Sequence, residues 1–168
     1  MTKKGQAALE FLTTYAWAFL VILIMVGALA YFGILRPTKL LPDRCNFGTE
    51  INCVDFALRY GTTGLDGSIN LRLKNSFGEA VYVNSINITS DTSTLLTCTL
   101  STPSIASPGF LWNTDATQDF AFITCNTAAS GFVQGEKSRF DIRLTYYSAK
   151  TSATYAKQVS GEIFATVV

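Results

Sequence analysis

The chain starts with a long apolar stretch and continues as alternating apolar and polar positions. After Glu10 the next charged residue is Arg36, so residues 11–35 are an uncharged run of 25 residues, of which 17 are large apolar or aromatic. A helix over this run is about 37 Å long, which is enough to cross a bilayer core of about 30 Å. Exposing its large side chains to water would cost on the order of 25–50 kcal/mol. We therefore expect the helix to lie in lipid or against other protein.

The first predicted element is one helix over residues 6–35. No proline interrupts it, and its alanine, leucine and methionine residues favour a helix. Gly33 and Pro37 are typical of a helix end. Residues 36–44, which contain Pro37 and Pro42, are predicted to be a linker.

From residue 45 onward, short segments alternate with a period of two, which is typical of strands with one buried face. Seven or so such strands separated by turn residues favour a sandwich. The predicted fold class is therefore α+β, a long N-terminal hydrophobic helix followed by an all-β, Ig-like β-sandwich over residues 45–168. The predicted strands lie near residues 54–60, 69–74, 81–88, 94–100, 119–125, 139–146 and 159–167.

Two local irregularities are predicted between these strands. Residues 75–79 read as a hairpin loop, with positive φ at Asn75 and Gly78. The next strand changes phase, because its apolar residues are on one face up to Val83 and on the other from Ile86. A β-bulge near 84–85 would bring both sets to the same side.

Four cysteines, Cys45, Cys53, Cys98 and Cys125, all follow the apolar run. An even number beyond a membrane segment indicates disulfides in an oxidising compartment. Three pairings are possible, and proximity in sequence favours Cys45–Cys53 with Cys98–Cys125. Buried free thiols are the alternative, whereas the spacing does not match a zinc site.

The composition contains little that points to chemistry. There is no histidine, which is the commonest general base and metal ligand, and the net charge is +1 without a basic stripe. We predict no catalytic residue, no metal, no other cofactor and no nucleic-acid partner. The protein is therefore not expected to be an enzyme.

The most informative motif is Lys3-Lys4-Gly5-Gln6-Ala7-Ala8-Leu9-Glu10-Phe11, which leads directly into the apolar run. It resembles the start of archaeal type IV pilins with a class III signal peptide, in which a basic leader ends in glycine before Gln, small residues, Glu and Phe. Ala8 stands where the family often has serine, which preserves the small size.

The resemblance implies that residues 1–5 are a leader recognised by a prepilin peptidase through Lys3, Lys4 and Gly5. Cleavage would fall between Gly5 and Gln6. Cutting before the apolar run keeps it in the mature protein, whereas an ordinary secretory signal loses its apolar core.

The resemblance also implies that Gln6, Glu10 and Phe11 act in assembly. The mature chain would carry an ammonium group on Gln6 and a carboxylate on Glu10. In a helix bundle these charges could pair between neighbours and set the axial register, because buried charges need partners. The alternative is that Glu10 is a solvated residue flanking a membrane helix.

The implied product is an extracellular filament of identical subunits, with the helix in its core and the β domain on its surface, used in adhesion. The implied partners are the prepilin peptidase, an assembly ATPase with its membrane platform, and membrane lipid before assembly. The precursor would lie in the cell membrane.

One rival motif is Ala28-Leu29-Ala30, which matches the A-x-A form of a signal-peptidase site. Cleavage there would release a domain that starts at Tyr31. The chain would then be a secreted or membrane-anchored β-sandwich binding module that does not polymerise.

Two features of the β domain complete the predictions. Asn87-Ile88-Thr89 is an N-glycosylation sequon, and the alternative is a strand residue that fits the pattern by chance. Four aromatic residues could form an adhesive patch, although packing in the core is the commoner use; they are Trp112, Phe132, Tyr146 and Tyr147.

Overall fold

Helix α1 spans Lys3–Tyr31 in the computed structural model, which describes residues 3–31, 41–90 and 96–168. The helix begins before the predicted start at residue 6, because a single glycine such as Gly5 costs a helix only about 1 kcal/mol. The predicted end at residue 35 and the linker residues 36–40 lie outside the described residues. Side chains of α1 are described from Glu10 onward.

The chain divides into two units, Met1–Leu41 and Pro42–Val168. The second unit begins before the predicted boundary at residue 45. Its first residues already take part in the β domain, because Asp43 forms an ion pair with Lys137 and Arg44 is the first residue of strand β1.

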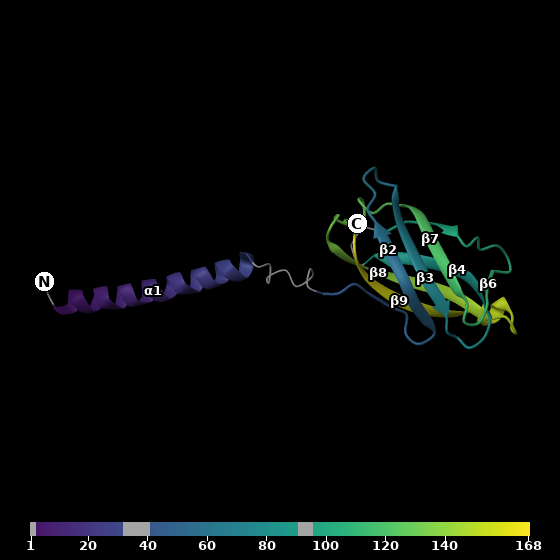
Figure 1. Cartoon of the computed structure of the whole chain (residues 1–168), viewed down its shortest axis with the longest axis horizontal. Helices are drawn as coiled ribbons and strands as arrows, with labels where there is room; N and C mark the ends of the chain where they lie inside the picture. The colour runs from purple at the N-terminus through teal and green to yellow at the C-terminus, as the bar shows by residue number, and fades with distance from the viewer. Residues whose placement is uncertain (1–2, 32–40, 91–95) are drawn as a thin grey trace. The chain divides into compact units, whose positions relative to one another are not determined.

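The second unit is a β-sandwich of two antiparallel sheets, which confirms the predicted fold class (Figure 1). The five-stranded sheet has the order β1 (Arg44–Asn46), β9 (Lys157–Thr166), β8 (Lys137–Ser148), β4 (Val81–Ser90) and β6 (Phe110–Trp112). The four-stranded sheet has the order β2 (Ile51–Arg59), β3 (Gly67–Asn75), β7 (Thr117–Cys125) and β5 (Thr99–Thr102). A short 3₁₀ helix, η1 (Ala153–Tyr155), precedes β9.

The strand order is that of an Ig-like sandwich. The order β2-β3-β7-β5 corresponds to the A-B-E-D sheet of immunoglobulin domains, and β9-β8-β4 corresponds to the facing G-F-C sheet. The chain departs from that plan between β5 and β7, because it returns to the five-stranded sheet and places the additional three-residue strand β6 beside β4.

The core lies between the sheets and is built by the predicted alternation. Ile69, Leu71 and Leu73 of β3 are at most 1% exposed, and the apolar positions of β8 and β9 face them. The predicted bulge in β4 is confirmed, since the register with β8 shifts between Val83 and Ser85. The shift lets the apolar residues on both sides of it enter the core.

The predicted hairpin at residues 75–79 is wrong. The segment joins β3 of one sheet to β4 of the other, so it crosses between the layers. Gly78 has the expected positive φ of +78°, whereas Asn75 ends β3 in a buried position. A loop of this length can form either a hairpin within one sheet or a connection between the two sheets. Which of the two forms depends on the strands with which β3 and β4 pair in the tertiary structure.

Several strand bounds also differ from the predictions. The described part of the chain contains nine strands, and β1 and β6 were not predicted because three residues are too short to show a period. The strand expected at 94–100 is β5 at Thr99–Thr102; residues 96–98 precede it, and 94–95 lie outside the described residues.

Candidate functional site

The first candidate site is the surface of α1. Glu10–Tyr31 is a stretch of 22 residues that is long and apolar enough to cross a membrane, and all of its residues are exposed in the single chain. The exposure extends around the helix, with Phe11, Leu12 and Trp17 on three different sides each more than 60% exposed. A helix that is apolar on all sides requires a lipid or protein environment on all sides.

Glu10 is the only charged residue of this stretch and lies at its N-terminal end. Its backbone carbonyl accepts hydrogen bonds from the Thr13 and Thr14 hydroxyls at 3.0 and 2.8 Å, which satisfies both hydroxyls within the helix. Among the described residues, its carboxylate has no hydrogen-bond or ion-pair partner. It is therefore available to a partner from outside the chain.

Phe11 follows Glu10 and contacts Tyr15 one turn later, with ring centroids 4.8 Å apart and ring planes tilted by 37°. Lys3, Lys4, Gly5 and Gln6 belong to the first turns of α1. Their side chains are outside the described part, so the leader and register roles remain predictions.

The β domain contains two disulfides, Cys45–Cys53 and Cys98–Cys125, which is the pairing favoured by proximity in sequence. The first joins β1 of one sheet to β2 of the other. The second joins the segment before β5 to the end of β7, where Cys125 is fully buried.

Asn87 lies on β4 with an exposed side chain, between the buried side chains of Ile86 and Ile88. Its cross-strand neighbour on β8 is Arg143, which is also exposed. The sequon therefore lies on the solvent side of the five-stranded sheet.

The four aromatic residues considered as an adhesive patch are buried. Trp112 is 1% exposed, packs edge-on against Phe120 and donates its Nε1–H to the carbonyl of Ala116 at 2.9 Å. Tyr147 donates its hydroxyl to the carbonyl of Pro108 at 2.8 Å. Burial raises the pKa of Tyr146. These residues, together with the 3% exposed Phe132, stabilise the core.

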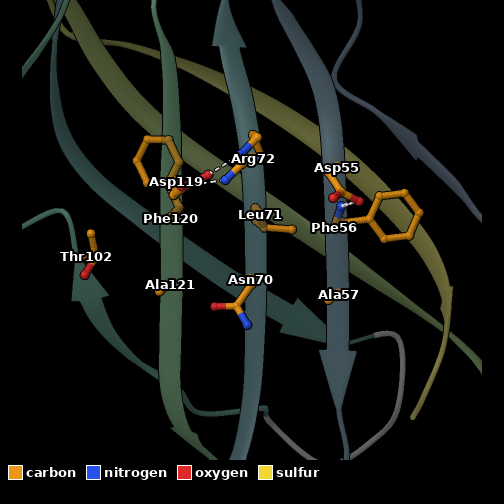
Figure 2. Close-up of a pocket in the computed structure, with 10 residues that line it drawn as sticks. All are labelled: Asp55, Phe56, Ala57, Asn70, Leu71, Arg72, Thr102, Asp119, Phe120 and Ala121. Atoms are coloured by element: carbon orange, nitrogen blue, oxygen red, sulfur yellow. Dashed lines mark hydrogen bonds and ion pairs between the residues drawn. The ribbon is translucent and has the colours of Figure 1, made fainter.

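The second candidate site is a shallow trough on the outer face of the four-stranded sheet (Figure 2). Its floor is a row of short side chains in register across three strands, with Ala57 on β2, Asn70 on β3 and Ala121 on β7. A parallel row one step along the strands places Asp55, Arg72 and Asp119 side by side. The two alanines of the floor are shorter than the charged side chains beside them, which contributes to the hollow.

Arg72 and Asp119 form a bidentate pair at the edge of the trough. Arg72 Nε and Nη2 donate to the two carboxylate oxygens of Asp119 at 2.7 and 3.0 Å. This hydrogen bonding lowers the pKa of Asp119 and raises that of Arg72. Asp55 accepts from the backbone N–H of Phe56 at 2.8 Å. The charged groups are thus already engaged, and the open trough is suited to contact with a surface.

The charged row could not be found by sequence reasoning. Alternation with the buried Leu71 and Leu73 places Arg72 on the solvent face of its strand. Its partner, however, depends on the pairing of β3 with β7, and 41 residues separate these two strands in the sequence. No metal site was predicted, and no group of three or more metal-ligating side chains occurs in residues 3–31, 41–90 and 96–168.

No protein-family model matches the chain, and no curated protein matches it significantly.

Proposed function

We propose that the chain is the precursor of a structural subunit of an archaeal type IV pilus-like filament. The observation that carries the proposal is the surface of α1, which is apolar and exposed over Glu10–Tyr31 with a single carboxylate at its N-terminal end. Such a helix fits equally well in a bilayer and in a bundle of identical helices. Transfer from one to the other needs little net change in apolar burial.

The segment before the helix supports a cleavage that retains it. Lys3 and Lys4 favour a cytoplasmic position for the N-terminus, since basic residues flanking a membrane helix remain inside. Cleavage by a prepilin peptidase between Gly5 and Gln6 would remove these charges and leave an ammonium group at the helix start. The assembly ATPase and its membrane platform would then move the helix from lipid into the filament.

The carboxylate of Glu10, which has no partner within the described part of the chain, supports a register role. In a packed bundle it would pair with the Gln6 ammonium of a neighbouring subunit. At any other axial offset between the helices the buried charge would have no partner, which would cost free energy. The two disulfides of the β domain fit a position outside the cell. Adhesion is the proposed use of the filament surface formed by these domains.

The test is the intact mass and N-terminal sequence of the mature protein. A start at Gln6 supports the proposal, and Gly5→Val should block the cleavage, whereas the matched change Ala8→Ser should leave it intact. A start at Tyr31 would show signal-peptidase cleavage after Ala30 and a secreted domain. An uncut leader in the wild type would also contradict the proposal.

A second candidate function is a membrane-anchored extracellular binding module. The open trough of Figure 2, with its floor of Ala57, Asn70 and Ala121, is the observation that favours it. The two functions differ in whether the protein is recovered in sedimentable filaments sheared from cells or only in membranes.

A further inference from the structure

The edges of the two sheets are protected in different ways, and one is left open. An exposed edge strand is a template for pairing with another chain, and natural proteins limit this with short strands, bulges, charges or covering groups. The strands β1 and β6 are three residues long and β5 is four. These three edges are therefore too short to recruit a long partner strand.

The edge strand β2 is longer, and it carries other protection. Its register with β3 shifts between Cys53 and Asp55, which marks a bulge, and it carries charges at Asp55 and Arg59. Its end is also covered, because Val168 exchanges backbone hydrogen bonds with Leu58 and Tyr60. The edge of β9 is covered by β1 only from Glu162 to Phe164. The part of β9 beyond β1 begins with the charged residue Lys157, which protects it.

The open edge belongs to β4. It pairs with β8 along its length but with β6 only from Val81 to Val83, so Asn84–Thr89 has no partner strand on that side among the described residues. The strand has no charged residue and no proline anywhere between Val81 and Ser90. A bulge lies only at the start of this open segment. An uncharged, proline-free strand of this kind is prone to edge-to-edge association.

The sequon lies in the middle of this open segment. The Asn87 side chain is exposed, and its amide has no hydrogen-bond partner among the described residues. It borders a hollow beside the edge, which is lined by Ile86 and Ile88 on β4 and by Leu96, Leu100 and Phe122 opposite. A sugar at this position would project into solvent from the outer face of β4, beside the unpaired edge, and would not disturb the core.

We propose that Asn87 carries an N-linked glycan that covers the open edge of β4 and prevents another chain from pairing with it. The donor is a lipid-linked oligosaccharide. The bond between Asn87 Nδ2 and the anomeric carbon forms as the bond from that carbon to the lipid phosphate oxygen breaks. The amide loses one proton, and the lipid phosphate leaves with the bonding electron pair. The proposal rests on the extracellular position of the β domain in the proposed function.

The modification is tested on the full chain purified from a host that N-glycosylates exported proteins. Mass spectrometry of the proteolytic peptide that spans Asn87 should show a glycan in the wild type and in Thr89→Ser, which keeps the sequon. It should show none in Thr89→Ala. An unmodified Asn87 overturns this inference; if the same chain still begins at Gln6 and forms filaments, the proposed function stands.

The covering role is tested on the secreted domain Pro42–Val168, a separate unit with its own core and disulfides. Asn87→Gln removes the glycan and leaves a neutral edge, so sedimentation should show concentration-dependent oligomers where the wild type is monomeric. Asn87→Asp also removes the glycan but places a charge opposite Arg143, and it should stay monomeric. A monomeric Asn87→Gln, or equal association of both variants, overturns the covering role.

Discussion

The Lys137 ammonium lies 2.7 Å from the Asp43 carboxylate, which also accepts a hydrogen bond from the Thr166 hydroxyl at 3.1 Å. The Lys137 side chain is only 14% exposed, so this pair is better shielded than the others on the domain. Hydrogen bonding from Lys137, followed by that from Thr166, holds the pKa of Asp43 below its ordinary value. The first residues of the β domain are thereby attached to β8 and β9.

Asp43→Asn should destabilise the β domain at neutral pH by about 0.5–1 kcal/mol, a small value because the carboxylate is itself partly exposed and screened. A carboxylate whose pKa is lower in the folded than in the unfolded state stabilises the fold at pH values above the unfolded-state pKa. This stabilisation is lost as the pH falls through the folded-state pKa. Wild type and variant should therefore converge in acid. Chemical denaturation at neutral and acidic pH measures this, with Glu136→Gln on the exposed turn as the control.

Asn75 should be among the positions least tolerant of change in the β domain. It is fully buried, and its Nδ2 donates to the carbonyls of Glu79, Trp112 and Asn113 at 3.0, 3.0 and 3.1 Å, while its Oδ1 accepts from the Phe77 N–H. Asn75→Ala removes these hydrogen bonds from a buried site and should cost about 2–4 kcal/mol of unfolding free energy. Denaturant unfolding of the domain measures the loss.

Two matched variants separate hydrogen bonding from other effects at this position. Asn75→Asp keeps the size but turns an oxygen toward carbonyl oxygens, so it should be at least as destabilising as Asn75→Ala. Asn70→Ala lies on the same strand with an exposed side chain and should change stability by no more than about 0.5 kcal/mol. Similar losses for Asn70→Ala and Asn75→Ala would contradict the assigned role.

Alternation predicted the strands that carry the core, because each such strand buries one complete face. It located Ile69 to Leu73 on β3 and even the phase change in β4, since a bulge is the simplest way to bury residues on both sides of Asn84. These features are local, and the sequence pattern contains them directly.

The order of the strands and the role of Asn75 could not be predicted, because both depend on residues distant in sequence. An asparagine followed within a few residues by a glycine, as Asn75 is by Gly78, is typical of a turn. Whether its amide becomes buried depends on the carbonyls of Trp112 and Asn113, which β6 brings to it. The row of Asp55, Arg72 and Asp119 likewise requires the register of three strands.

The two disulfides should contribute unequally to stability. Cys98–Cys125 spans a sequence separation of 27 and Cys45–Cys53 one of 8. Loop-closure entropy predicts losses of about 3.6 and 2.6 kcal/mol when each pair is replaced by alanine. The loss for the first pair should be the larger, since Cys125 is also in the core. Thermal and denaturant unfolding of the two double variants compare them, and the reverse order would contradict the prediction.

Glu10 should be required for assembly and dispensable for membrane insertion, because its carboxylate has no partner among the side chains that the structure describes. Glu10→Gln keeps the size of the side chain and removes its charge. The yield of sheared filaments should therefore fall by about tenfold or more, because losing about 1.4 kcal/mol for each contact between Glu10 and a neighbouring subunit corresponds to a factor of ten. Glu10→Asp keeps the charge and should retain part of the yield. Membrane levels and cleavage before Gln6 should be unchanged in both, as shown by immunoblot and N-terminal sequencing. Normal filaments from Glu10→Gln would remove the register role of the carboxylate.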